Sequence, residues 1–267
     1  MFSNQTELYI SASGKPGNFG CSVYNKLFGL NKIDSIYLPR SVTCAEQLIS
    51  SIKCLKIKGC SVSMPLKSKV IPFLDELDSI SAETNSVNTI VNNNGILKGW
   101  NTDFWGFKEA ISKYEFQSAI IYGSGSVVHS ILKALIEQNI QDILITARNY
   151  GEAQKIGNLY SVKSMEFGEL SKNKGLTKDI LINATPAGNL SSHEMFNLID
   201  LCHMVFDLSV NKDLNPLLKY ALAKGKKAIE GLEMCEYQLQ KQMLIYTGIE
   251  VDIDSIHNIV LSTYQQR

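Results

Sequence analysis

The chain has 267 residues, of which 45% are hydrophobic and 19% charged. This composition is typical of a soluble globular protein that buries one large or two modest cores. The 26 basic and 26 acidic side chains cancel, so neither nucleic acid nor a membrane is expected as a partner. The start, MFSNQTELYI, is unlike a signal peptide, and no apolar run approaches the ~20 residues of a membrane span. We expect a cytoplasmic protein.

The six cysteines and four histidines show no spacing typical of a metal site. No C-x-x-C or H-x-x-x-H sequence occurs, and Cys54 and Cys60 are too isolated to form a metal knuckle. We expect reduced, mostly structural thiols and no metal.

Strand and helix patterns alternate in the first part of the chain. In chain order the residues predict a strand at Leu8–Ser11, a helix from Ala45 to Leu55 closed by Gly59, a strand at Cys60–Met64, and a helix at Lys67–Leu77 despite Pro72. The dipeptide Asn94-Gly95 separates Thr89–Val91 from Ile96–Lys98. Asn-Gly suits the positive φ angles of a tight turn, so this segment predicts a β-hairpin.

A second α/β segment follows. Helices are predicted at Asp103–Lys113, Val127–Gln138, Glu233–Tyr246 and Ile253–Tyr264, and strands at Ala119–Tyr122, Ile143–Thr146, Ile180–Asn183 and Val205–Leu208. Asn215 followed by Pro216 predicts the start of a further helix. The alternation predicts an α/β fold with mainly parallel sheets. We expect domains at 1–101 and 102–235, with terminal helices at 236–267 that return to the first domain.

Lys67 and Asp103 are the strongest candidates for chemistry. They follow short strands on either side of the predicted hairpin, in SVSMPLK (61–67) and in SVNTIVNNNGILKGWNTD (86–103). Reduction of a ketone by hydride puts charge on its oxygen, which must gain a proton. A lysine held by a carboxylate can supply that proton. The alternative is a surface ion pair or two ordinary helix-start residues.

A glycine-rich loop lies between a predicted strand and a predicted helix in IIYGSGSVV (120–128). Gly123 permits a tight turn, and Gly125 lets the backbone approach a pyrophosphate at the helix N-terminus. Ser124 and Ser126 belong to the same loop, and Val128 stands where a third glycine is usual. The loop predicts a dinucleotide site.

The next predicted strand ends in TARN (146–149), where an NAD site normally has an acidic residue. Arg148 could instead pair with the 2′-phosphate of NADP, beside Asn149; the alternative is a solvated loop arginine. Thr185, in Asn183-Ala184-Thr185-Pro186, could line the cofactor ribose, or this segment could be a plain turn. NADP is favoured over NAD.

These motifs resemble the shikimate dehydrogenase family over most of the chain. SVSMPLK is similar to that family's N-V-T-x-P-x-K segment, and residues 72–107 are similar to its block ending G-x-N-T-D-x-x-G-F. The segments YGSGSVV, TARN, INATPAG and GLEMCEYQ resemble its cofactor loop, its N-R-T segment, its N-A-T-x-x-G turn and its G-x-x-M-x-x-x-Q segment.

The resemblance implies a Rossmann-like NADP domain after a substrate domain. It implies Lys67 and Asp103 as the catalytic pair, and contacts to substrate hydroxyls by Ser63, Asn88 and Gln238. The residues implied to serve NADP are Gly123, Gly125, Arg148 and Thr185, with Met234 near the nicotinamide. The implied reaction is the reversible, NADPH-dependent reduction of 3-dehydroshikimate to shikimate, by a monomer or a homodimer.

The N-terminal loop departs from the family pattern. Members carry two serines in S-x-S-P that hold the substrate carboxylate, whereas residues 14–25 are two residues shorter and lack that motif. Asn18 stands at one of the serine positions, and Ser11, Ser13 or Ser22 could substitute. The alternatives are therefore a paralogue that acts on quinate or another hydroxy acid, or a weakly catalytic NADP(H)-binding regulatory module.

Overall fold

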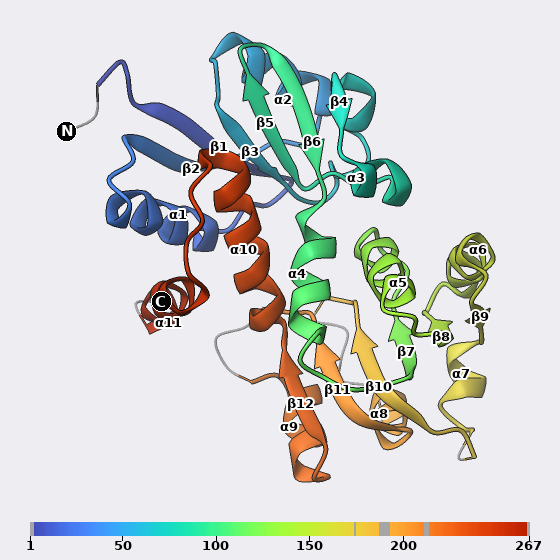
Figure 1. Cartoon of the computed structure of the whole chain (residues 1–267). Helices are drawn as coiled ribbons and strands as arrows, with labels where there is room; N and C mark the ends of the chain where they lie inside the picture. Colours follow the sequence, from blue (N-terminus) through green and yellow to red (C-terminus); the bar gives the residue numbers. More distant parts are fainter. Residues whose placement is uncertain (1–2, 174, 187–192, 211–213, 266–267) are drawn as a thin grey trace. The chain divides into compact units, whose positions relative to one another are not determined.

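The chain forms two compact units in the computed structural model, which describes residues 3–173, 175–186, 193–210 and 214–265. The first unit comprises Met1–Trp105 and Gln238–Arg267, and the second comprises Gly106–Tyr237. Within the described residues, each unit contains one six-stranded sheet accompanied by helices (Figure 1). The α/β class predicted from the sequence is confirmed.

The first unit has a mixed sheet. Its strands are β1 (Glu7–Ser13), β2 (Ser35–Ser41), β3 (Gly59–Val62), β4 (Glu76–Leu77), β5 (Thr89–Asn93) and β6 (Ile96–Trp100). Its helical segments include α1 (Phe19–Leu30), α2 (Ala45–Cys54), the 3₁₀ turn η1 (Ile71–Phe73), α3 (Ser79–Thr84) and α11 (Ile253–Gln265). The strand order is β2-β1-β3-β5-β6-β4. β1 runs parallel to β2 and β3, and β5 runs antiparallel to both β3 and β6.

The hairpin of β5 and β6 turns at Asn94 and Gly95, as predicted. Their φ angles of 53° and 95° are both left-handed, which is what a two-residue turn of this hand requires. The turn pairs Thr89 with Trp100 at the open end of the hairpin. The segment before β5 therefore lies beside the segment after β6.

The predicted helix from Ala45 is confirmed as α2, but it ends at Cys54 and Gly59 does not close it. Gly59 is the first residue of β3, where an added Cβ would lie 2.7 Å from the Tyr246 ring. The glycine is needed because Tyr246, on helix α10 (Gly231–Thr247), packs directly on the strand.

The prediction of a helix at Lys67–Leu77 is wrong. The structure has only η1 in this segment, followed by β4 at its end. Pro72 lacks an N–H for a helical ladder, and the edge of the sheet holds the next residues extended. Asp75 N donates to Leu97 O (2.9 Å), and Leu97 N donates to Asp75 Oδ2 (2.7 Å).

The C-terminal helix belongs to the first unit. Helix α11 packs against α1 (Figure 1). Lys26 Nζ on α1 donates to Ser262 Oγ (3.1 Å) and Thr263 Oγ1 (3.2 Å) on α11. The end of the chain thus completes the unit that its beginning starts.

The second unit has a parallel sheet. Its strands are β7 (Ser118–Tyr122), β8 (Asp142–Thr146), β9 (Lys163–Ser164), β10 (Lys178–Asn183), β11 (Cys202–Asp207) and β12 (Lys227–Glu230). They run parallel in the order β12-β11-β10-β7-β8-β9. This is the doubly wound order of a Rossmann-like fold, and the order reverses between β7 and β10.

Helices connect these strands. They are α5 (Val127–Glu137), α6 (Tyr150–Tyr160), α7 (Phe167–Leu170), α8 (His193–Asp200) and α9 (Pro216–Ala223). Asn215 caps α9 as predicted, because its Oδ1 accepts from Leu218 N (2.9 Å). Two further helices, α4 (Thr102–Ile111) and α10 (Gly231–Thr247), have residues in both units.

All six cysteines are free. Among the described helices, none is both long and apolar enough to cross a bilayer. Within the same residues, no group of three or more histidine, cysteine, aspartate or glutamate side chains could hold a metal ion.

Candidate functional site

Lys67 and Asp103, predicted as a pair, form an ion pair in the first unit. Lys67 lies in the segment after β3, and Asp103 lies in the first turn of α4. Lys67 Nζ is 2.5 Å from Asp103 Oδ2, and the two side chains are 14% and 6% exposed. The pair is thus largely removed from water, and Lys67 keeps a small exposed fraction.

The start of α4 fixes the position of Asp103. Asn101 precedes the helix, and its Oδ1 accepts from Asp103 N (3.1 Å) and Phe104 N (3.4 Å). Asn101 Nδ2 donates to Thr84 Oγ1 (2.8 Å), which ties this turn to α3. A carboxylate in the first turn of a helix is also stabilised by the helix dipole.

Asn88, predicted to contact substrate, holds the other carboxylate oxygen. Its Nδ2 donates to Asp103 Oδ1 (2.8 Å). Its Oδ1 accepts from Thr102 N (2.9 Å), Thr102 Oγ1 (3.0 Å) and Thr89 Oγ1 (2.9 Å). Asn88 is buried, so its hydrogen bonds are made to the protein. This orientation leaves the carboxylate facing Lys67.

The arrangement can move a proton. A lysine ammonium has three donors, and one of them is directed at Asp103. The others can reach the oxygen of a bound alcohol or ketone, to which lysine can donate a proton or from which, when neutral, it can take one.

Gln242 also belongs to this network, and sequence reasoning missed it. Its Nε2 donates to Thr89 Oγ1 (2.6 Å), and its Oε1 accepts from Tyr24 OH and from Ser61 Oγ (3.4 Å). A signal was present: Gln242 falls in the buried stripe of α10 that contains Leu239, Met243 and Tyr246. A glutamine in an otherwise apolar stripe needs buried partners.

Three of the predicted substrate serines lie near the ends of neighbouring strands. Ser11 and Ser13 are in β1, and Ser63 follows β3. Ser63 N donates to Ala12 O (2.9 Å), and Ser11 is paired with Ser61 across the strands. Ser63 is exposed, whereas Ser13 is buried. The structure therefore groups these hydroxyl residues near the carboxyl-terminal ends of β1 and β3.

The remaining predicted substrate residues lie on helices. Asn18 is the exposed N-cap residue of α1, and its side chain makes no capping hydrogen bond. Ser22 lies one turn into α1 and is half-buried, and Gln238 is half-buried on α10. Gln238 precedes Gln242 by one helical turn, so both project from one side of the helix.

The predicted glycine loop follows β7 in the second unit, at the point where the strand order reverses. Gly123 has φ of 140°, and an added Cβ would lie 3.1 Å from Ala184 O. Gly125 is exposed, with open space where a Cβ would be. Ser124 and Ser126 are half-buried beside it. Only glycine fits the first position, and the second leaves backbone free for a ligand.

The helix after this loop begins without a side-chain cap. Ser126 is the N-cap residue of α5, and its side chain makes no capping hydrogen bond. The first backbone N–H groups of a helix have no partner within the helix and favour an anion such as a pyrophosphate. Val128, in place of a third glycine, is fully buried.

Arg148 and Asn149 follow β8 and are both exposed. Asn149 caps α6 by accepting from Glu152 N (3.3 Å), which gives it a structural role. Among the residues that the structure describes, the Arg148 guanidinium pairs with no carboxylate.

Thr185 lies at the end of β10, in a buried polar cluster. Thr185 Oγ1 donates to Asn183 Oδ1 (2.7 Å), and Asn183 Nδ2 donates to Asp207 Oδ2 (3.2 Å). Asn215 Nδ2 donates to the same oxygen (2.6 Å). Met234 is buried on α10. The final glycine of the INATPAG segment lies outside the described residues.

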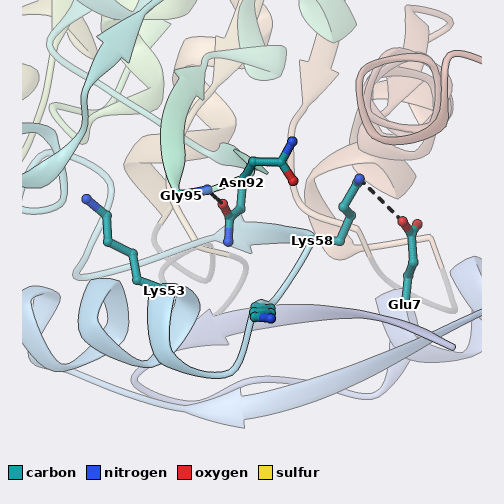
Figure 2. A pocket seen from close by; sticks show the side chains of 7 residues that line it. Glu7, Lys53, Lys58, Asn92 and Gly95 are labelled. Carbon is teal, nitrogen blue, oxygen red and sulfur yellow. Dashed lines mark hydrogen bonds and ion pairs between the residues drawn. The ribbon is translucent and has the colours of Figure 1, made fainter. Parts of the chain in front are cut away.

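A separate polar pocket of about 530 Å³ lies elsewhere in the first unit (Figure 2). In Figure 2 Lys58 points toward Glu7, to which it is ion-paired at 3.3 Å. Lys53 is paired with Asp75 at 3.6 Å, and Asn92 Oδ1 accepts from Gly95 N in the hairpin turn (2.8 Å). None of the predicted catalytic, substrate or cofactor residues lines it.

Two family models match this chain. Residues 19–90 match the family model of the shikimate dehydrogenase substrate binding domain, and residues 107–226 match that of shikimate / quinate 5-dehydrogenase.

Individual relatives align along most of the chain. A shikimate dehydrogenase-like protein of Haemophilus influenzae is 32% identical, with 92% of this chain and 93% of that protein aligned. A shikimate dehydrogenase (NADP(+)) of Pyrococcus furiosus is 32% identical over 100% of both chains. The solved structure of a shikimate 5-dehydrogenase-like protein superposes with a TM-score of 0.87 at 30% identity, covering 99% of this chain and 100% of that one. The chain belongs to the shikimate dehydrogenase family.

Proposed function

We propose that this protein is an NADP-dependent oxidoreductase that interconverts 3-dehydroshikimate and shikimate. The observation that carries the proposal is the buried contact of Lys67 with Asp103, which Asn88 orients. The first unit would carry the substrate and the second unit the cofactor. The name of the Pyrococcus furiosus relative, which specifies NADP(+), supports this choice of cofactor.

Lys67 is the proton donor in the direction of reduction. When bound, the nicotinamide supplies a hydride to the carbonyl carbon, and the carbonyl oxygen then takes a proton from Lys67 Nζ. Asp103 keeps the ammonium in place and stabilises its charge, and in the reverse direction neutral lysine takes the hydroxyl proton. The proton, the hydride and the charges balance in both directions.

The residues of the second unit fit NADP. The uncapped start of α5 and the open space at Gly125 suit a pyrophosphate. Arg148 is exposed, and its fork of donors matches a 2′-phosphate. Thr185 and Met234 would contact the ribose and the nicotinamide.

The motif that binds the substrate carboxylate is where this chain differs from its family. Without the S-x-S-P motif, each charge-assisted hydrogen bond not replaced costs about 1.5–3 kcal/mol. Ser11, Ser13, Asn18 and Ser22 are the candidate replacements, with Ser63 and Gln238 for hydroxyls. Because the contacts to the carboxylate differ, quinate or another cyclic hydroxy acid is the alternative substrate.

The test is steady-state reduction of NADP⁺ with shikimate, with quinate, and with no acid. We expect turnover with shikimate well above the control without acid. Turnover with quinate alone would establish the alternative substrate. NADPH binding without turnover of either acid would contradict the proposal and favour the regulatory module.

A further inference from the structure

We infer that Gln242 is a positioning residue for the proposed reaction, acting on Asp103 through Thr89 and Asn88. The inference rests on the proposed function, because it concerns the same proton-transfer pair. It adds a residue on α10, buried and remote in sequence, that sets the direction in which the carboxylate points.

The four residues form a continuous chain of hydrogen bonds. Gln242 Nε2 donates to Thr89 Oγ1 (2.6 Å), Thr89 Oγ1 donates to Asn88 Oδ1 (2.9 Å), and Asn88 Nδ2 donates to Asp103 Oδ1 (2.8 Å). The other carboxylate oxygen meets Lys67. Gln242, Thr89, Asn88 and Asp103 are all buried, so water competes little for these bonds.

Two backbone groups determine which way the side-chain amides of Gln242 and Asn88 are oriented in this series of hydrogen bonds. Asn88 O can only accept, and it lies 3.5 Å from the Gln242 amide, so Nε2 faces it. Thr102 N can only donate, and it meets the Asn88 side chain at Oδ1 (2.9 Å). The Asn88 amide nitrogen must then face Asp103. The Thr89 proton points to Asn88 Oδ1 (2.9 Å), which is closer than the other acceptor in reach, Thr102 Oγ1 (3.4 Å).

The oxygen end of Gln242 is equally occupied. Gln242 Oε1 accepts from Tyr24 OH and from Ser61 Oγ, and Ser61 Oγ lies 2.9 Å from Tyr246 OH. Rotation of the Gln242 amide would place its oxygen against the Asn88 carbonyl, which can only accept. The Asn88 carbonyl therefore favours the orientation in which Gln242 donates to Thr89, and the Tyr24 and Ser61 hydroxyls satisfy the amide oxygen in that orientation.

Loss of this chain of hydrogen bonds should affect catalysis more than binding. If Thr89 cannot donate, Asn88 keeps only the Thr102 contacts at its oxygen, and its hold on Asp103 Oδ1 weakens. A carboxylate free to rotate aligns Lys67 less often with the substrate oxygen, and such misalignment reduces the rate of the chemical step.

Thr89→Val keeps the shape of the side chain and removes the hydroxyl, whereas Thr89→Ser restores the hydroxyl. We expect Thr89→Val and Gln242→Met each to lower kcat about tenfold, with the KM for NADP⁺ unchanged. Thr89→Ser should recover most of the lost kcat. The double variant should be about as slow as either single variant, because both break one chain.

Gln240→Met is the matched control on the same helix. Gln240 Nε2 donates to Val251 O (2.8 Å), away from this chain of hydrogen bonds, so its loss should leave kcat unchanged. Equal kcat for Thr89→Val and Thr89→Ser, or additive effects in the double variant, would overturn the inference.

A readout without substrate separates this inference from the proposed function. In proton–nitrogen correlation spectra of the unliganded protein, the Asn88 side-chain amide signals should shift in Thr89→Val and Gln242→Met but stay near the original in Thr89→Ser. Unshifted signals would overturn the chain of hydrogen bonds whether or not the protein turns over shikimate. Shifted signals in a protein that turns over no hydroxy acid would instead overturn the proposed function alone.

Discussion

Lys67 is distinguished from the other lysines near it by burial and by its partner. Lys69, two residues later, is exposed, whereas Lys67 is mostly buried against a carboxylate. A lysine in such a position can be held in one rotamer and aimed at a substrate, which a solvated side chain cannot.

Lys67→Ala should lower kcat by ~10²-fold or more, because a general acid–base group contributes about that much. The dissociation constant for NADPH should stay nearly unchanged, since the predicted cofactor residues belong to the second unit. Both quantities can be measured by steady-state kinetics and fluorescence titration, with Lys69→Ala as the control. A Lys67→Ala protein that keeps most of its kcat would remove lysine from the proposed role.

Arg148→Ala tests the choice between NADP and NAD. A guanidinium paired with a 2′-phosphate contributes about 1.5–3 kcal/mol or more. We therefore expect the dissociation constant for NADPH to rise by about 10–100-fold and that for NADH to change little. Arg148→Lys keeps the charge but loses the fork, so its effect on NADPH should be intermediate. Equal weakening of both cofactors would show that Arg148 does not bind the phosphate.

At the scale of elements, Asp179 ties the start of β10 to the start of β7. Its Oδ2 accepts from Gln117 N, Ser118 N and Ser118 Oγ, each at 2.9 Å. The backbone N–H of Gln117 is the main cause that lowers the pKa of this carboxyl, with Ser118 adding to it against the opposing effect of burial. The ionised form is therefore favoured in the folded protein.

A lowered pKa in the folded state gives a stability contribution with a definite pH range. It is complete above the ordinary aspartate pKa of about 3.9 and is lost as the pH falls through the folded value. Asp179→Ala should lower the free energy of unfolding by about 1–2 kcal/mol at neutral pH and flatten its decline in acid. Urea unfolding at several pH values, with exposed Glu115→Ala as the control, measures this. An unchanged acid limb would contradict the assignment.

Elements with local signals were predictable from the sequence. Asn94-Gly95 determines its own turn conformation, and Asn215-Pro216 supplies both a cap and a first helical position. The helix prediction for the segment after Lys67 was wrong because the conformation of this segment depends on the hydrogen bonds between Leu97 and Asp75. These form only when the sheet has formed. Its periodicity alone resembles a helix.

Some residues of the candidate site could likewise be predicted from the sequence, and others could not. Lys67 and Asp103 could be paired because the hairpin between them brings their strand ends together. The partners of Gln242 could not be predicted, because they come from β3, β5 and α1, and the apolar stripe of α10 does not specify which residues pack against it. A buried polar side chain in an apolar stripe indicates that it has hydrogen-bond partners, but only the fold shows which residues they are.

At the scale of the whole molecule, each of the two units contains a hydrophobic core. Leu181 and Val205 belong to the core of the second unit, and Val62 and Ile90 to that of the first. Cores of this kind can open as separate cooperative units, each with its own free energy. The predicted cofactor residues all lie in the second unit and the proposed proton-transfer pair in the first.

NADPH should therefore protect the second unit more than the first from hydrogen exchange. At about 100 times the dissociation constant, a ligand adds about 2.7 kcal/mol to the unfolding free energy of the part that binds it. Core amides in β7 and β10 should then exchange about 100-fold more slowly, whereas those in β1 and β3 should change much less. Mass-spectrometric exchange on the full chain measures both sets at once, and Arg148→Ala should reduce the protection because NADPH binds it less tightly. Equal slowing in both sheets would mean that the units open together, and no slowing in β7 and β10 would contradict a cofactor site at the glycine loop.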